Sequence, residues 1–206
     1  DVGKTVVSAL LVRGLLRRDI PVRYLKPAQT GDDSDTETVK KLSRLPADRM
    51  IDPVLWLPLP ASVDQAAEDA GVSVQLSSIH SGVVGHLQDD PESLWILECA
   101  GGLRVPYNAH EDQADLLETL KHPIVLVARS GLGTLNHTLL TIEAMEARGL
   151  SLAALFLVGD AHPANVKTLR RRLSHTPIYE LPRFENLNTE SLDDWLNTSE
   201  IERLFP

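Results

Sequence analysis

The chain opens on residues that can bind phosphate. Asp1-Val2-Gly3-Lys4-Thr5 matches the second half of the motif G-x-x-x-x-G-K-[ST]. In that motif, backbone N–H groups at a helix start hold phosphate oxygens, the lysine reaches the β- and γ-phosphates, and the threonine hydroxyl binds Mg²⁺. A helical pattern over residues 6–18 follows at once. For so short a match the alternative is an ordinary turn into a helix, and the first glycine and the strand that feeds the loop would lie upstream of Asp1.

Carboxylates that could hold Mg²⁺ follow an apolar strand and a polar loop. Glu98 ends the run Ser93-Leu94-Trp95-Ile96-Leu97, and the small residues after it let a ligand approach the backbone. Asp35 is a second candidate, although spacing does not show whether it, Asp32 or Asp33 faces the metal. The alternatives are a solvated acid at a strand end for Glu98 and an ordinary helix start for Asp35.

A second lysine has a place close to the predicted phosphate site. Lys26 stands between an apolar strand and Pro27, which keeps the preceding backbone extended. It would lie over the catalytic end of the sheet, near the phosphates held by Lys4, and a solvated charge at a strand end is the alternative. Metal hydrolysis and serine catalysis are poorly supported, because the sequence has no H-E-x-x-H and no G-x-S-x-G. Cys99 is interpreted as a small packing residue.

The elements that must position these side chains alternate between apolar strands and amphipathic helices. This rhythm predicts an α/β fold with a mostly parallel, doubly wound sheet, helices on both faces, and ligands beyond the carboxyl ends of the strands. The less periodic stretch 46–71 is predicted as a long excursion with a short helix at 63–69, and the tail 189–204 as a capping helix. Strands are predicted at Val22–Leu25, Leu94–Leu97, 124–127 and Leu152–Val158, and a further helix at 134–148.

Length and composition restrict the possible partners. The chain has 206 residues, of which 43% are hydrophobic. This length and composition suit one α/β domain with a full core. A net charge of -9 argues against binding to nucleic acid, whose partners are usually basic. Cys99 is the only cysteine, which excludes an intrachain disulfide and indicates a reducing compartment. No apolar run is long enough to cross a membrane, so a cytoplasmic location is expected.

Four motifs taken in order resemble dethiobiotin synthetase over residues 1–182, which is most of the chain. That family is a P-loop ligase that uses ATP and Mg²⁺ as a homodimer. It closes the ureido ring of dethiobiotin from 7,8-diaminononanoate and CO₂, through a carbamate and a carbamic-phosphoric anhydride. The four motifs are Asp1-Val2-Gly3-Lys4-Thr5, Tyr24 to Gly31 with Ser34-Asp35, Glu98-Cys99-Ala100-Gly101-Gly102 with Val105-Pro106, and Gly131-Leu132-Gly133-Thr134-Leu135-Asn136-His137.

The resemblance implies a role for each matching residue. Lys4 would hold the β- and γ-phosphates, and Lys26 would orient the carbamate and stabilise charge during phosphoryl transfer. Thr5, Asp35 and Glu98 would coordinate Mg²⁺. The substrate would contact Lys26 and Thr30, and its carboxylate would bind at Gly133 and Asn136 near the dimer interface. The ATP-binding set would comprise Asp1, Val2, Gly3, Lys4, Thr5, Asp35, Glu98, Cys99, Ala100, Gly101, Gly159 and Asp160, with Pro182, Arg183 and Phe184 lining the adenine.

The chain departs from the family pattern at three places. Cys99 stands where the family usually has glycine, Ser62-Val63-Asp64 replaces Ser-Pro-His, and Gly159-Asp160 replaces Asn-Asp. The last change removes an amide that would read the adenine edge, which predicts weak discrimination among nucleoside triphosphates. The second changes a segment that the resemblance associates with substrate fit.

Two other classes share the P-loop. A regulatory ATPase of the MinD/ParA type would have glycine where Asp1 stands, and its membrane-binding members end in a basic helix. The tail of this chain is acidic instead. An amidoligase of the cobyrinate diamide synthase type needs an additional glutaminase domain with a nucleophilic cysteine, for which 206 residues leave no room.

Overall fold

The computed structural model describes residues 2–31 and 34–205, so the predictions made for Asp1, Asp32 and Asp33 lie outside the described residues. Every pair of neighbouring strands in this part of the chain is parallel, and the strands form sheets in the orders β3-β1-β5, β6-β7-β8 and β2-β4. The strands are β1 (Val22–Leu25), β2 (Ala28–Thr30), β3 (Met50–Ile51), β4 (Leu55–Leu57), β5 (Leu94–Leu97), β6 (Ile124–Arg129), β7 (Leu152–Val158) and β8 (Ile178–Leu181).

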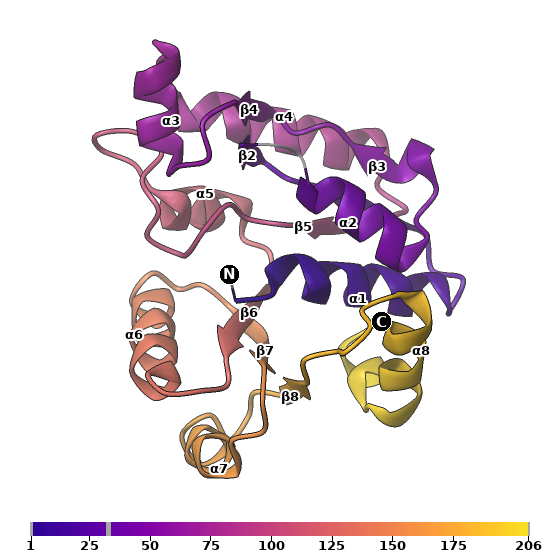
Figure 1. Ribbon diagram of the computed structural model, residues 1–206. Helices are drawn as coiled ribbons and strands as arrows, with labels where there is room; N and C mark the ends of the chain where they lie inside the picture. The colour runs from indigo at the N-terminus through magenta and orange to yellow at the C-terminus, as the bar shows by residue number, and fades with distance from the viewer. Residues whose placement is uncertain (1, 32–33, 206) are drawn as a thin grey trace.

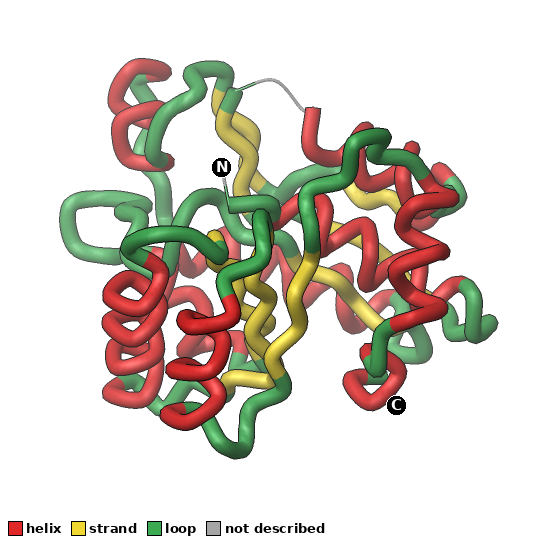
Figure 2. The backbone as a smooth tube through the Cα atoms, turned by 60° about the horizontal axis from the view of Figure 1, so that its bottom comes forward, coloured by secondary structure: helices red, strands yellow, loops and turns green. Residues whose placement is uncertain are grey.

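Helices cover both faces of the two three-stranded sheets (Figures 1 and 2). This arrangement confirms the predicted doubly wound α/β fold. None of the helices in the described residues is long and apolar enough to cross a membrane. The helices are α1 (Lys4–Leu16), α2 (Ser34–Ser43), α3 (Val63–Ala70), α4 (Leu76–Asp89), α5 (Gln113–Leu120), α6 (Thr134–Ala147), α7 (Pro163–Arg172) and α8 (Thr189–Thr198), with short 3₁₀ turns at Ala47–Arg49 and Ile201–Leu204.

The alternation of side chains along β7 shows how one strand serves both layers. Ala154 and Phe156 are buried in the core that contains α1 and α8. Leu155 and Leu157 point the other way, into a core formed with α6 and α7. Successive residues of a strand face opposite sides of a sheet, so a continuous apolar run is the pattern that a strand covered on both faces requires.

Helix α1 is the central element of the larger core. Its residues Val7, Leu10, Leu11 and Leu15 are buried among side chains of β1, β7, α2 and α8. Figure 1 shows α1 in indigo crossing the middle of the molecule, with α2 beside it. Burial on several sides explains why its sequence is apolar almost throughout, and it fixes the N-terminus of α1 relative to both sheets.

A bidentate ion pair ties α8 to α1. The Arg13 guanidinium donates from Nε and Nη2 to the two Asp193 carboxylate oxygens, each over 2.8 Å. These hydrogen bonds outweigh partial burial and lower the pKa of Asp193 below its ordinary value. Such forked geometry is the strongest form of an arginine–carboxylate contact.

Asp193→Asn is expected to lower the free energy of unfolding at neutral pH by about 1 kcal/mol, since the pair is partly exposed. The pKa of Asp193 is lower in the folded chain, so its stabilisation is present above the unfolded pKa and is lost as pH falls through the folded pKa. Denaturant titrations of the unchanged protein and of Asp193→Asn between pH 7 and pH 2 measure the difference in their free energies of unfolding. A constant difference at every pH would contradict the assignment.

The structure refines two predictions about irregular regions. The excursion 46–71 contains not only the short helix but also β3 and β4, and β4 pairs with β2 directly after Lys26 and Pro27. The tail helix α8 ends at Thr198, and a separate 3₁₀ turn at Ile201–Leu204 follows. Phe205 then packs so closely on Gly14 that a Cβ atom there would lie 2.7 Å from the Phe205 ring.

The two larger sheets face each other across an apolar cavity of about 760 Å³. Among the described residues β5 is paired only with β1, and β6 only with β7, so the other edges of both strands face this cavity. Leu11 and Leu15 of α1 line one wall, and Leu116 and Leu120 of α5 line another. The polar end of the cavity, at Lys4 and Glu98, belongs to the candidate active site.

Candidate active site

The site begins at the N-terminus of α1. Gly3 precedes the helix with φ of 94°, a left-handed conformation that glycine adopts without strain. A Cβ atom at this position would also lie 3.0 Å from Val158 Cγ1. The structure therefore requires glycine where the motif has it, and Lys4 becomes the first residue of a helix whose free N–H groups can bind phosphate.

Thr5 brings together the two predicted carboxylates. Its Oγ1 lies 3.0 Å from Asp35 Oδ1 and 2.8 Å from Glu98 Oε1, although the three residues are far apart in sequence. A hydroxyl has one proton and can donate to only one of these oxygens at a time. The second carboxylate oxygen therefore faces the hydroxyl oxygen without a proton between them, and a cation at this point would satisfy both carboxylates.

These donors fit Mg²⁺ better than a transition metal. Hydroxyl and carboxylate oxygens are hard ligands, and Mg²⁺ normally binds one or two carboxylates and completes its shell with phosphate oxygens and water. No group of three or more His, Cys, Asp or Glu side chains suited to a metal occurs in the described parts of the chain. A site with two carboxylates and one hydroxyl thus leaves room for a nucleotide to supply the remaining ligands.

Lys26 is buried beside this set, with only 4% of its surface exposed. Its Nζ donates to Asp35 Oδ2 over 2.6 Å. Burial raises the pKa of Asp35, but the hydrogen bonds from Lys26 and Thr5 and the charges of Lys26 and Lys4 outweigh it, so the net shift is downward. The alternative of a solvated lysine at a strand end is therefore wrong. A buried cation costs free energy unless it is paired, which makes Lys26 a candidate for direct chemistry.

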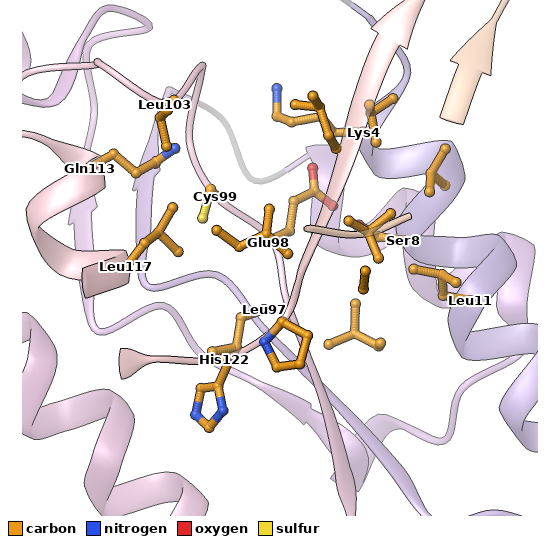
Figure 3. A pocket seen from close by; sticks show the side chains of 18 of the residues that line it. Lys4, Ser8, Leu11, Leu97, Glu98, Cys99, Leu103, Gln113, Leu117 and His122 are labelled. Carbon is orange, nitrogen blue, oxygen red and sulfur yellow. The ribbon is translucent and has the colours of Figure 1, made fainter. Parts of the chain in front are cut away.

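The chain after Glu98 forms the rim of the site. Gly101 has φ of 72°, and a Cβ atom there would lie 2.6 Å from Val105 Cγ2. The amide of the buried Gln113 donates to the Gly102 carbonyl over 3.0 Å and holds this loop. Figure 3 shows Lys4 at the top of the cavity, Glu98 below it and His122 at the far end.

Cys99 and Ala100 belong to the packing of this rim rather than to its reactive groups. Burial, followed by the neighbouring Glu98 charge, raises the pKa of the Cys99 thiol to about 11. A thiol with this pKa stays protonated at neutral pH and is a poor nucleophile. Ala100 packs against the core that contains α3, α4 and α5.

A second group of predicted residues lies at the ends of β7 and β8. Gly159 follows β7 with φ of 130°, and a Cβ atom there would lie 2.8 Å from Ser130 Oγ. A side chain at this position would displace the Ser130 hydroxyl and strain the backbone. Asp160 and Arg183 are exposed, and Arg183 Nε lies 3.9 Å from Asp160 Oδ1. Pro182, next to Arg183 in the chain, is also exposed. Phe184 packs against the larger core.

The residues predicted to contact substrate fall into two separate places. Thr30 ends β2, close to Lys26 in the chain. Gly133 precedes α6 with φ of 90°, and its helix begins without a side-chain cap, so free N–H groups point outward there. Asn136 is exposed in the first turn of α6. Among the described residues no hydrogen bond or ion pair joins Gly133 or Asn136 to Lys26 or Thr5.

Sequence reasoning missed two polar side chains that support the site. The Tyr24 hydroxyl donates to Glu98 Oε2 over 2.9 Å, and Gln113 holds the loop after Glu98. Tyr24 belongs to an apolar strand, and Gln113 begins a helix, so local pattern assigns both to structure. A tyrosine and a glutamine at buried positions of otherwise apolar segments are the signal that could have identified them.

Fold and site together define a nucleotide-binding protein of the P-loop class. A family model described as an AAA domain matches residues 1–191. The signal recognition particle 54 kDa protein from Aeropyrum pernix K1, solved in complex with GDP, has a similar fold, with a TM-score of 0.50 and 17% identity. The similarity covers 98% of this chain and 45% of that one, so the present chain spans less than half of its length.

Two relatives identify the family. ATP-dependent dethiobiotin synthetase BioD from Rhodopseudomonas palustris (strain BisB5) is 35% identical over 193 residues, which are 93% of this chain and 85% of the relative. The protein of the same name from Paramagnetospirillum magneticum is 41% identical over 167 residues, which are 80% and 75% of the two chains. The chain belongs to the dethiobiotin synthetase family.

Proposed function

We propose that this chain is an ATP-dependent dethiobiotin synthetase that forms the ureido ring of dethiobiotin in biotin biosynthesis. One amine of 7,8-diaminononanoate adds to CO₂ and loses a proton to give a carbamate. A carbamate oxygen then attacks the γ-phosphorus of ATP and ADP leaves, which produces a carbamic-phosphoric anhydride. The second amine attacks the carbonyl carbon, the C–N bond forms, and the C–O bond to phosphate breaks.

The observation that carries this proposal is the buried Lys26 beside the phosphate site. Lys4 at the start of α1 accounts for nucleotide binding in P-loop proteins generally. A second lysine, buried and paired with Asp35 at 2.6 Å, is suited to stabilise the negative charge that develops between a carbamate and the γ-phosphoryl group. Preorganised charges of this kind act most strongly where water is excluded.

The metal and nucleotide have assigned places in this proposal. Thr5, Asp35 and Glu98 would hold Mg²⁺, which would neutralise charge on the β- and γ-phosphates. Lys4 and the N–H groups at the start of α1 would bind the phosphates. The exposed residues Asp160, Pro182 and Arg183 would border the adenine, since they follow the same ends of neighbouring strands β7 and β8.

The substrate carboxylate is assigned to the N-terminus of α6 near Gly133 and Asn136. Leu132, immediately before it, is 99% exposed, and Leu140 on α6 is 55% exposed. Large apolar side chains that solvent surrounds in one copy are suited to an interface. We therefore infer a homodimer that contacts through this part of α6. The lone cysteine agrees with a reducing, cytoplasmic setting.

The alternatives have less support. Helix α8 is tied to α1 through Asp193 and its last turn has no basic residue, so this helix does not fit the basic membrane-binding helix of a regulatory ATPase. The Cys99 thiol has a raised pKa, so Cys99 does not fit the nucleophilic cysteine that an amidoligase of the cobyrinate type uses. The relatives are named as dethiobiotin synthetases.

Release of phosphate tests the proposed function. It should require ATP, Mg²⁺, bicarbonate and 7,8-diaminononanoate together, because the carbamate is the phosphoryl acceptor. Omission of each component in turn, with phosphate measured by a coupled assay and product by mass spectrometry, gives the result. A steady ATPase that is indifferent to the diamine would instead support the regulatory class.

Weak discrimination among nucleoside triphosphates is expected. Rejection of a wrong base depends on buried polar groups that it leaves unpaired, and Gly159 offers no side-chain amide. Values of kcat/KM for ATP, CTP and GTP should therefore lie close together. A strong preference for ATP would mean that backbone groups near Pro182 read the adenine instead.

A further inference from the structure

We propose that Tyr24 is a positioning residue for the metal-binding carboxylate: its buried hydroxyl fixes the rotation of the Glu98 carboxylate and so presents one oxygen to Thr5 and the Mg²⁺ site. The proposal rests on the role of Glu98 in the proposed function. It adds a residue that local sequence pattern assigns to the core alone. Tyr24 acts through Glu98 and is not itself a catalytic residue.

The geometry assigns one hydroxyl to each oxygen of Glu98. Tyr24 Oη donates to Oε2 over 2.9 Å, and Thr5 Oγ1 lies 2.8 Å from Oε1. Tyr24 lies on β1, paired with Ile96 of the neighbouring strand β5, and Glu98 follows two residues later. Tyr24 and Glu98 therefore lie on the same face of the sheet, about two residues apart along it, a separation that the long tyrosine side chain spans.

Packing fixes where the Tyr24 hydroxyl lies. The side chain has no exposed surface and is among the largest fully buried side chains of the described residues. It belongs to the core around α1, the helix that also carries Thr5. The Tyr24 and Thr5 hydroxyls beside Glu98 thus come from one packed unit, and the carboxylate cannot turn without breaking the hydrogen bond from Tyr24.

Glu98 needs such a constraint. The strand fixes its backbone, but the last torsion of a glutamate side chain is broad and lets the two oxygens exchange places. Glu98 is only 4% exposed, so bulk water does not supply a replacement for a lost hydroxyl. Hydrogen bonds to a charged group are among the stronger ones in proteins. Loss of the Tyr24 hydroxyl should therefore weaken metal binding while it leaves the phosphate-binding helix intact.

Tyr107 provides a matched control. It is also almost fully buried, with 1% exposure, and its hydroxyl makes no hydrogen bond within the described residues. Tyr24→Phe and Tyr107→Phe remove the same atom from equally buried rings. A general effect of removing a buried hydroxyl would appear in both variants, whereas an effect on the Glu98 carboxylate would appear only in Tyr24→Phe.

The experiment measures ADP binding by calorimetry with and without Mg²⁺, in the absence of diamine and bicarbonate. Without Mg²⁺, Tyr24→Phe should bind ADP as tightly as the unchanged protein does. Mg²⁺ raises the ADP affinity of the unchanged protein, and this gain should be about tenfold smaller in Tyr24→Phe. Tyr107→Phe should keep the full gain. Thermal unfolding of each variant without ligand shows whether it is folded.

A double-mutant cycle with Glu98→Gln tests whether Tyr24 acts through Glu98. In the Glu98→Gln background, Tyr24→Phe should cause no further loss of the Mg²⁺-dependent gain. The proposal is overturned if Tyr24→Phe keeps the full gain, if it weakens ADP binding equally with and without Mg²⁺, or if its effect persists in the Glu98→Gln background. Because the assay contains no diamine, failure of the ligase reaction would leave this result unchanged.

Discussion

Lys26→Gln is expected to lower kcat by about a hundredfold or more, which is the scale of losing one preorganised electrostatic group. The neutral amide can still occupy the space beside Asp35, but it no longer stabilises charge between the carbamate and the γ-phosphoryl group. ATP binding should weaken much less, because Lys4 and the N–H groups at the start of α1 make the phosphate contacts. The loss should therefore appear in kcat at saturating diamine.

Initial rates over a range of diamine concentrations and calorimetry with a non-hydrolysable ATP analogue separate these effects. Lys40→Gln is a suitable control, because Lys40 is a partly exposed lysine of α2 whose ion pair with Glu37 lies on the surface. Near-normal turnover of Lys26→Gln would remove Lys26 from the chemistry. It would also weaken the carbamate-phosphorylation mechanism assigned to this site.

Glu98→Gln is expected to lower Mg²⁺-dependent turnover by about a hundredfold to a thousandfold. The substitution should not destabilise the metal-free protein. Without a cation, the Glu98 and Asp35 carboxylates both approach the Thr5 hydroxyl and repel each other. The amide removes one of these charges and can still accept a hydrogen bond from Tyr24. Relief of about 1 kcal/mol would raise Tm by about 2–4 °C for a domain of this size.

Thermal unfolding in EDTA, together with turnover across a Mg²⁺ titration, measures both parts of this expectation. Glu92→Gln is the control, since Glu92 is exposed just before β5. A variant that loses activity and also unfolds several degrees lower would indicate that Glu98 is chiefly a structural residue. Loss of activity with unchanged or higher Tm is the pattern typical of a functional site.

The long apolar strands could be predicted from sequence, and the short elements could not. The runs at β1, β5 and β7 have the predicted bounds. Mostly apolar runs of this kind are typical of strands covered by helices, and β7 is apolar throughout. Strands β2, β3 and β4 have two or three residues each, too few for a period. Helix α4 contains Gly82 and Gly85, which weaken its local propensity. Tertiary contacts decide such segments.

The site residues could be predicted as types but not as neighbours. The motif and the strand ends identify Thr5, Glu98 and Lys26, yet no spacing shows that Thr5 reaches Asp35 and Glu98 together, or that Lys26 is almost fully buried. Burial of a lysine depends on the elements that fold over it. The same holds for Tyr24, whose place in the core is predictable but whose hydroxyl partner is not.

The facing edges of β5 and β6 impose strict requirements on any extended segment that enters the cavity between them. Unpaired N–H and C=O groups of a strand edge are templates for strand addition. A segment that ran parallel to both edges would keep the sheet all-parallel. It would also need apolar side chains on both faces, since α1 lies on one side and α5 on the other. A single apolar strand that paired with both edges would join the two three-stranded sheets into one sheet between the helices.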